Sequence, residues 1–280
     1  MRMGYRAKRA FYRFTVYAIL LIVGVIILFP FYWMVSTAFK PRAEIVKRPP
    51  TFFPENPTIV HFKNVFAKVP YFRNLYNSLF ISGMTTVISI FFSTMAGYAI
   101  ARYRCIGLNF IFMLILSALM IPPFIIAIPL YMVAAQVGLV NTLWGVIVPF
   151  SISNFGIFMM RQFTLGVPED LISSARIDGA SEFKILIRII FPVVASGCAA
   201  LGILKFLVTW NDLFWPLLML TRDDKKTLTV MLATFIDFQR FIDYGLLMAC
   251  TTLVVLPVIV LFVFFQRRII EGVAISGMKG

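Results

Sequence analysis

The chain has 280 residues, of which 60% are hydrophobic and only 14% are charged. About a quarter of the residues in soluble globular domains are charged, so this composition excludes a soluble domain. Apolar runs recur along the sequence, and several reach the length of about 20 helical residues that crosses the hydrocarbon core of a bilayer. We therefore predict an all-α integral membrane protein.

The formal net charge is +14, and the basic residues cluster at the ends of the apolar runs. Cytoplasmic loops and anionic lipid headgroups favour this placement. The sequence has no basic stripe interleaved with aromatic residues, so we expect no nucleic-acid partner. With His61 as the single histidine, no metal site is expected. Cys105, Cys198 and Cys250 are expected to be small buried hydrophobic residues, not disulfide partners.

The first apolar run follows a basic tail. Residues 1–13 contain five basic residues and no acidic one, and the uncharged run Phe14–Phe39 comes next. This run is too long for the apolar region of a signal peptide, and it ends without a small-residue cleavage pattern. We predict a retained first span at residues 14–38, preceded by a cytoplasmic N-terminal tail at 1–13.

Five further apolar runs predict the remaining spans, for six transmembrane helices within residues 14–268. These spans cover residues 76–101, 108–135, 142–160, 190–220 and 244–265. Pro122, Pro123 and Pro129 lie in the third span and predict a kink or a break, because proline removes a backbone donor. Such a break needs neighbouring protein or a water-filled cavity around it. The third span is thus a candidate to line a pathway, with a packed kink as the alternative.

Charge also predicts the orientation of the spans. The basic N-terminal tail and the short loop with Arg102 and Arg104 favour the cytoplasm. The loop between the first two spans carries seven basic residues, but loops of this length follow the rule less strictly. Both termini, including a tail at 269–280, and the loop at 164–190 are then cytoplasmic. Short helices are expected at 61–69 and, with an amphipathic pattern, within 221–243.

One internal segment is unusually polar: Pro168–Pro192, with the sequence PEDLISSARIDGASEFKILIRIIFP. Pro168, Glu169 and Asp170 suit the first turn of a helix, where proline is tolerated and acidic side chains complement the helix dipole. Gly179 predicts a turn, and Ser181 predicts the cap of a second helix.

The two helices have distinct expected apolar faces. These faces comprise Leu171, Ile172, Ala175 and Ile177 on the first helix, and Phe183, Leu186, Ile187 and Ile190 on the second. By itself this pattern is equally consistent with an amphipathic helix that only lies on the lipid surface.

The same segment resembles the cytoplasmic loop of permease subunits of ATP-binding-cassette importers. Its signature is Glu-Ala-Ala, three residues, Gly, nine residues, then Ile-x-Leu-Pro. Here Gly179 sets the register, with Ile189 followed by Phe191 and Pro192. Other segments look like the carbohydrate branch of this family, of the maltose-transporter second-permease type. They include AGYAIARYR at 96–104, TWNDLFWPLLML at 209–220 and EGVAISGMKG at 271–280.

The resemblance implies a permease with six transmembrane helices and a cytoplasmic coupling-helix loop, of the type I importer fold. It implies one half of a heterodimeric pathway for a sugar or oligosaccharide, formed with a second, similar permease in the cell inner membrane. Two cytoplasmic ATPase subunits and an extracytoplasmic sugar-binding protein are the other implied partners, besides membrane lipid. The implied ATPase contacts are Glu169, Asp170, Ser173, Ser174, Ala175, Arg176, Ile177, Asp178, Gly179 and Ala180, with Ser276, Gly277 and Lys279 of the tail.

This chain is not expected to be an enzyme or to hold a cofactor. In the segment from Gly272 to Lys279, Met278 stands where a phosphate-binding loop needs lysine before Ser or Thr. ATP and Mg²⁺ are therefore expected on the partner ATPase subunits.

The polar segment departs from the family pattern at the signature glutamate. Ser173, Ser174 and Ala175 replace Glu-Ala-Ala, so no salt bridge can form from the first position. We expect the partner permease to retain this glutamate. Docking here is then expected to rely on shape together with Arg176 and Asp178, with Glu169 and Asp170 as further substitutes.

A second departure is Lys205 in the middle of the fifth span. A lysine there costs at least about 2.5 kcal/mol and usually faces a cavity or a partner charge. One hypothesis is that Lys205 faces the pathway and favours an acidic, uronate-type oligosaccharide; the alternative is that it snorkels or pairs with an acid of the partner permease. Asn211, Asp212 and Asn154 are further pathway candidates, although amides also pack between helices.

Two other classes of function are weaker alternatives. A secondary transporter normally shows an internal repeat and ionisable residues at the bilayer midplane. No repeat is found, and Lys205 stands nearly alone. A membrane-embedded enzyme needs clustered histidine, serine or carboxylate residues, which the apolar runs do not provide.

Overall fold

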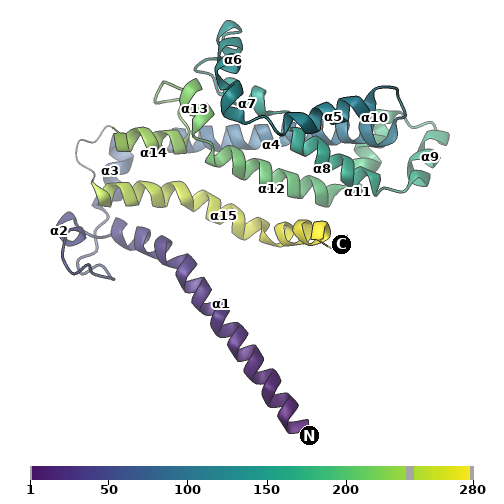
Figure 1. The fold of residues 1–280 in the computed structure, drawn as a ribbon. Coiled ribbons are helices and arrows are strands. Elements are labelled where there is room, and N and C mark those ends of the chain that lie inside the picture. Colours follow the sequence, from purple (N-terminus) through teal and green to yellow (C-terminus); the bar gives the residue numbers. More distant parts are fainter. Residues whose placement is uncertain (1, 238–242, 278–280) are drawn as a thin grey trace. The chain divides into compact units, whose positions relative to one another are not determined.

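The computed structural model describes the backbone of residues 2–237 and 243–277 and the side chains of residues 8–234 and 243–263. Every regular element in the described part is a helix, which confirms the predicted all-α class (Figure 1). The chain divides into two compact units, Met1–Val69 with Thr234–Leu256, and Pro70–Ala233 with Pro257–Gly280. Each unit is described separately below.

Three helices are long and apolar enough to cross a membrane without a break. They are Lys8–Ala38 within α1 (Arg2–Ala38), α4 (Tyr71–Arg102), and Tyr244–Val263 within α15 (Tyr244–Gly277). Three bent pairs also qualify, so the described residues contain up to six spans if each pair forms one. The pairs are α5 (Leu108–Ala118) with α6 (Pro123–Gln136), α7 (Leu143–Phe150) with α8 (Asn154–Leu165), and Glu182–Val193 with α12 (Ala195–Asn211).

The break predicted in the third span is present. The axes of α5 and α6 differ by 104°, and Pro122 has an extended backbone at the start of α6, with Pro123 in its first turn. Proline is accepted there because the first helical amides have no partner within the helix. Pro129 lies inside α6 without ending it.

The fourth and fifth spans are also broken, which the sequence analysis did not predict. The fourth bends by 46° where the Ser153 hydroxyl caps α8 by accepting from the Gly156 amide at 3.0 Å. The expected continuous span at 190–220 is wrong, since α12 ends at Asn211 and α13 begins at Phe214 (Phe214–Met219). The cause is Asp212, whose carboxylate accepts from the Phe214 amide at 3.1 Å and so starts a new helix.

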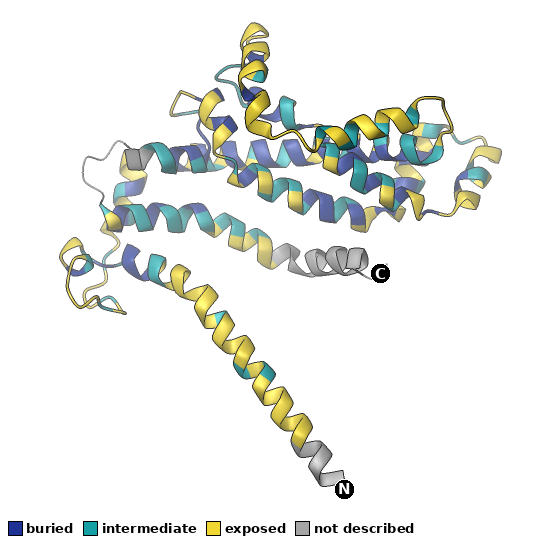
Figure 2. Ribbon diagram, in the orientation of Figure 1, coloured by how far each residue is buried: buried dark blue, intermediate teal, exposed yellow. Residues whose placement is uncertain are grey.

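In the larger unit, α4 packs against both α8 and α12, and much of α4 is buried (Figure 2). Its buried residues include the small residues Ser82, Ser89, Ser93 and Gly97. A methyl group added at Gly97 would lie 2.7 Å from the backbone nitrogen of Arg161. One added at Gly156 of α8 would lie 2.4 Å from the Ser93 hydroxyl. Membrane helices have no hydrophobic drive to associate, so this close backbone approach is a main source of their contact.

A buried cluster closes one end of this helix group. It contains Tyr98, Met160, Val167, Ile172, Ile185, Leu186, Ile190, Val194 and Leu201. The members come from α4, α8, α12 and the polar segment after α8, including α9 (Glu169–Ile177), α10 (Glu182–Ile185) and the π-helix Leu186–Ile190. The polar segment is therefore packed into the membrane unit through its apolar side chains.

In the smaller unit, the loop after α1 holds α2 (Arg42–Ile45) and α3 (Val60–Lys68). The short helix expected at 61–69 is therefore confirmed. The His61 ring lies against the backbone of Gly245 in α15, since an added methyl group would come within 2.3 Å of it. Its Nε2 also lies 2.9 Å from the carbonyl oxygen of Lys40. Helix α14 (Leu228–Asp237), most of which belongs to the larger unit, follows α13, as expected for the loop at 221–243.

The packing of α4 generates the first prediction. Gly97→Ala places a methyl group against the α8 backbone, which cannot move aside like a side chain, and we expect a loss of about 1–3 kcal/mol in unfolding free energy. Gly83→Ala is the matched control, because a methyl group at Gly83 of the same helix meets nothing within 4 Å. Thermal unfolding of the purified protein in detergent measures both. Equal midpoints for the two variants would contradict the close packing.

Candidate functional site

The polar segment folds as the sequence predicts. Helix α9 begins after Pro168, with Glu169 and Asp170 in its first turn. Gly179 has a φ of +76°, a left-handed conformation that glycine adopts without strain, and it turns the chain toward α10. Ser181 caps α10 by accepting from the Lys184 amide. The result is two helical elements joined by a tight turn at one end of the larger unit.

The first end of α9 is fixed to α4 by Arg102, the last residue of α4. The Arg102 guanidinium donates to Glu169 at 2.6 Å, to the carbonyl of Thr164 at 2.7 Å and to the carbonyl of Val167. Its side chain is 9% exposed. Thr164 lies in the last turn of α8, so one buried cation joins the ends of α4 and α8 to the start of α9. We call these bonds the Arg102 contact.

The second end of α9 is fixed to α4 by Glu182. The Arg176 guanidinium of α9 donates to the Glu182 carboxylate at 2.7 Å, and the Tyr98 hydroxyl of α4 donates to the same carboxylate at 2.7 Å. Tyr98 and Arg102 are four residues apart, so they project from successive turns of α4. We call these bonds the Glu182 contact. Both ends of α9 are therefore bound to one helix.

The Glu182 contact is charged at neutral pH. Donation from Arg176 lowers the pKa of Glu182 to about 2; burial opposes this effect, and the Tyr98 hydroxyl adds to it. A carboxylate with a depressed pKa stabilises the folded state above its ordinary value of 4.5, and this contribution is lost as the pH falls toward about 2. The same pairing raises the pKa of Arg176.

The side of α9 that faces away from the core differs in part from the expected one. Ile172 is fully buried and Ala175 packs against the core, but Leu171 and Ile177 are 45% and 86% exposed. Ser174 and Asp178 are exposed beside them. We call Leu171, Ser174, Ile177 and Asp178 the outer face of α9.

The second helical element also differs from expectation. Phe183 is 62% exposed and Ile187 is 41% exposed, whereas Ile185, Leu186 and Ile190 are buried. Leu186 and Ile190 of the π-helix therefore face the core as expected, whereas Phe183 in α10 and Ile187 in the π-helix do not.

The other predicted contact residues of this segment lie around the outer face. Asp170 and Gly179 are exposed, and Ser173 and Ala180 are half-buried. The Ser174 hydroxyl donates to the carbonyl of Asp170 at 2.8 Å. Of the predicted tail contacts, Ser276 and Gly277 lie in the last turn of α15, where only the backbone is described, and Lys279 lies outside the described residues.

The predicted pathway residues lie at the start of α8, within α12 and directly after α12. Lys205 is half-buried in α12, with its Nζ 6.0 Å from the centroid of the Phe150 ring. It forms no ion pair with any residue in the described part of the chain. The Asn211 side chain bonds the carbonyl of Leu207 at 2.9 Å, and Asn154 opens α8.

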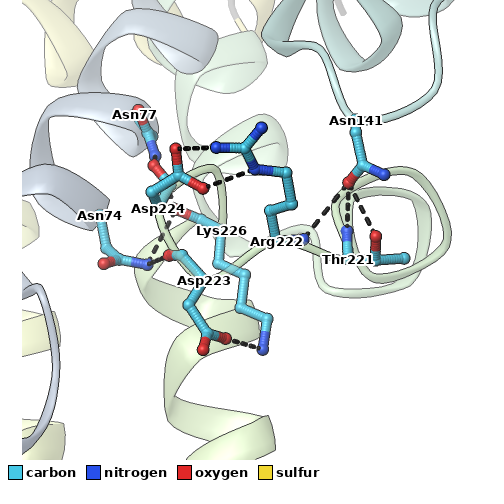
Figure 3. Close-up of polar contacts among 8 residues, drawn as sticks. All are labelled: Asn74, Asn77, Asn141, Thr221, Arg222, Asp223, Asp224 and Lys226. Carbon is cyan, nitrogen blue, oxygen red and sulfur yellow. Dashed lines mark hydrogen bonds and ion pairs between the residues drawn. The ribbon is translucent and has the colours of Figure 1, made fainter.

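A polar cluster that sequence reasoning missed lies at the opposite end of α4 (Figure 3). Asn74 and Asn77, on the first turns of α4, each donate to the carbonyl of Lys226 at 3.0 Å. Asn74 also donates to the carbonyl of Asp223 at 3.3 Å, and Asn77 to that of Asp224 at 3.0 Å. Two amides on one helix face thus hold the loop at 221–227 by its backbone.

Two flanking contacts complete this cluster. Arg222 forms an ion pair with Asp224 at 3.0 Å, within the loop itself. Asn141 accepts from the amide and the hydroxyl of Thr221 at 2.7 and 2.9 Å (Figure 3). The spacing of Asn74 and Asn77, three residues apart at the start of an apolar helix, was the available sequence signal.

The Arg102 contact generates the second prediction. Arg102→Met removes three bonds to a nearly buried guanidinium, and bonds to charged groups contribute about 1.5–3 kcal/mol each. We expect hydrogen exchange in residues 169–178 to accelerate at least about tenfold, which corresponds to 1.4 kcal/mol. Arg104→Met removes the same charge from an exposed position nearby and should leave the exchange unchanged. Equal exchange in both variants would contradict the assigned role of Arg102.

Several known proteins are similar to this chain in sequence or in fold. Residues 90–274 match the family model described as binding-protein-dependent transport system inner membrane component. The arabinooligosaccharides transport system permease protein AraQ of Halalkalibacterium halodurans is 36% identical over 92% of this chain and 93% of its own length. The lactose transport system permease protein LacG of Rhizobium radiobacter is 31% identical over 91% of this chain and 93% of its own length.

A solved structure agrees with this assignment at the level of the fold. One chain of a bacterial ABC transporter involved in import of the acidic polysaccharide alginate superposes with a TM-score of 0.81 and 22% identity. The match covers 90% of this chain and 94% of that one. Together, the family match over most of the helical region and the full-length relatives establish that the chain belongs to the binding-protein-dependent transport system inner membrane components.

Proposed function

We propose that this chain is a permease subunit of an ATP-driven importer of a sugar or oligosaccharide. It forms half of the transmembrane pathway with a second, similar permease, and receives its substrate from an extracytoplasmic binding protein. The names of AraQ and LacG support a sugar substrate. The structural observation that carries the proposal is the attachment of α9 to α4 at both ends, because a helix fixed in this way can transmit force.

In this proposal the outer face of α9 docks on a cytoplasmic ATPase subunit, where ATP and Mg²⁺ bind. Leu171 and Ile177 supply exposed apolar surface, and two exposed acids, Asp170 and Asp178, flank it. Arg176 is already paired with Glu182, so the charges available for docking are mainly acidic. These acids then replace the missing signature glutamate at Ser173, which the partner permease retains.

The proposed topology places the ATPase-facing parts of the chain on the cytoplasmic side. Residues 1–13, the loop at 164–190 and the tail at 269–280 lie in the cytoplasm, and residues 14–268 contain the spans. The tail residues Ser276, Gly277 and Lys279 make a second contact with the ATPase subunits. The loop at 221–227 then lies on the extracytoplasmic side, because it is bound to the other end of α4.

Movement of α9 reaches the pathway through α4. Closure of the ATPase subunits on ATP displaces α9, and the Arg102 and Glu182 contacts pass this displacement to the end of α4. Close packing along α4 carries α8 and α12 with it, because packed helices move as rigid bodies. The pathway residues Lys205, Asn211, Asp212 and Asn154 lie on these two helices or directly after α12. The result is alternating access of one site to the two sides of the membrane.

The outer face of α9 generates the third prediction. Ile177→Asp places a charge in the apolar docking surface, and we expect the ATPase subunit to be lost during purification of the complex. Ile106→Asp is the matched control, because Ile106 is also fully exposed but lies in the loop after α4. Retention of the ATPase subunit by the Ile177→Asp variant would contradict docking through this face.

Lys205 supports a finer proposal about the substrate. It is a cation on a spanning helix without a carboxylate in ion-pair distance among the described residues, and such groups usually face a pathway or a partner. We propose that it faces the pathway and favours an acidic, uronate-type oligosaccharide.

Transport measurements test the Lys205 proposal. Lys205→Ala should reduce uptake of acidic oligosaccharides by about tenfold or more, a factor that corresponds to 1.4 kcal/mol. Uptake of neutral oligosaccharides should remain, and Lys205→Arg should keep both activities because it keeps the charge. An unchanged preference in Lys205→Ala would leave Lys205 as a structural residue.

The importer itself is tested by reconstitution. ATP hydrolysis should appear only when the ATPase subunits and the sugar-loaded binding protein are both added to the permease pair in membranes. Uptake that needs neither ATP nor a binding protein would identify a secondary transporter instead.

A further inference from the structure

The loop that follows α1 is folded around two buried charges. Lys40 is 2% exposed, donates to the carbonyl of Thr51 and lies 4.7 Å from the centroid of the Trp33 ring. Glu44 is 6% exposed and accepts from the Thr51 hydroxyl at 2.8 Å and the Glu55 amide at 2.9 Å. Buried charges that bond the backbone on both sides of a segment fix its course. Residues 46–54 are therefore held in place and are not a loose connection.

This fixed course turns two aromatic side chains outward. Phe52 is 61% exposed and Phe53 is 74% exposed. Each still contacts α1: the Phe52 ring lies 6.1 Å from that of Trp33, and the Phe53 ring lies 5.9 Å from that of Tyr32. The carbonyl of Phe52 accepts from the Tyr32 hydroxyl at 2.7 Å and from the Ser36 hydroxyl at 2.9 Å. The two rings are thus held against the last turns of α1 while most of their own surface stays exposed.

The position along α1 gives the depth of these rings in the membrane. The uncharged part of α1 starts at Phe14, and a hydrocarbon core of about 30 Å takes about 20 helical residues. Tyr32 and Trp33 therefore lie where α1 leaves the hydrocarbon on the far side. Tyr and Trp are enriched at this level, because their rings are apolar and their polar groups reach the headgroups.

The charged side chains near Phe52 and Phe53 also fit a position at the level of the lipid headgroups. Arg42, Lys47 and Arg48 are exposed, as is Val46 at 69%. Lys47 pairs with Glu55, which leaves Arg42 and Arg48 as the excess positive charge around the segment. Basic side chains above an apolar patch fit phosphate groups above acyl chains.

We propose that residues 46–54 form an interfacial anchor, with Phe52 and Phe53 in the phospholipid headgroup region of the bilayer and Arg42 and Arg48 at the lipid phosphates. Lipid is favoured over a protein partner because exposed rings at the end of the apolar run are accompanied by exposed basic side chains, which matches acyl chains below phosphate groups. The anchor fixes the depth and rotation of α1 at its outer end. The inference needs α1 to span the membrane, but it does not depend on the substrate or on the ATPase contact.

Spin labelling tests this anchor in the assembled complex in lipid nanodiscs. A nitroxide at Phe53→Cys is introduced in a Cys105→Ser background, since Cys105 is the exposed native cysteine of the described residues. Reference labels are Ile27→Cys, exposed on α1 in the middle of the apolar run, and Lys68→Cys, exposed on α3. We expect the label at Phe53→Cys to be more accessible to oxygen than to a water-soluble nickel chelate. Its depth in the bilayer should lie between the depths of the labels at Ile27→Cys and Lys68→Cys.

Two results would overturn the proposal. Access to the nickel chelate equal to that at Lys68→Cys would place the segment in water. Protection from both reagents would place it against protein, such as the second permease or the binding protein.

If the labelled variant does not assemble, Phe53→Trp provides a conservative substitute. Its added fluorescence, measured as the difference from the unsubstituted protein, should be quenched by lipids brominated near the headgroup more than by lipids brominated near the chain end. Equal or absent quenching would also overturn the proposal.

Discussion

The structure depends on how closely the backbone of α4 approaches α8 and α12. Lipid tails are as apolar as the helices, so burial of apolar area does not drive these helices together, and van der Waals contact at short range must do so. Only small residues allow this approach: Gly97 lies against the α8 backbone and Gly156 against Ser93. Several other small residues of α4, such as Ser82 and Ser89, are buried as well.

This packing makes α4 a continuous strut between two polar ends. At 32 residues it is about 48 Å long, enough to cross a bilayer with its headgroups. Arg102 and Tyr98 hold the α9 segment at one end, and Asn74 and Asn77 hold the loop at 221–227 at the other. One rigid helix therefore connects the surface proposed to meet the ATPase with the surface proposed to lie outside the cell. Among the described residues, α4 is the candidate span that lies wholly within the larger unit without a bend.

Turns, helix caps and helix breaks were predicted correctly where a single residue type determines them. The Gly179 turn, the Ser181 cap and the break after Pro122 each follow from one residue type with one backbone requirement, so the sequence alone sufficed. Contacts between distant segments did not follow from it. Arg102 lies in a motif that the sequence analysis used, but its bonding partners lie more than 60 residues further along the chain. The helix break at Asp212 depends on a side chain that was expected to line the pathway. On the second helical element, the predicted core positions Leu186 and Ile190 are confirmed, whereas Phe183 and Ile187 are exposed, and the apolar pattern alone does not separate the two pairs.

The central claim is that the two contacts of α9 with α4 convert ATP hydrolysis into movement of the pathway. The direct measurement is the number of sugar molecules imported per ATP hydrolysed in proteoliposomes, for the unsubstituted complex and for a variant carrying both Arg102→Met and Glu182→Gln. The outer face of α9 is unchanged in this variant, so ATPase docking and hydrolysis should persist while import per ATP falls at least about tenfold. An unchanged ratio of import to hydrolysis would contradict the claim.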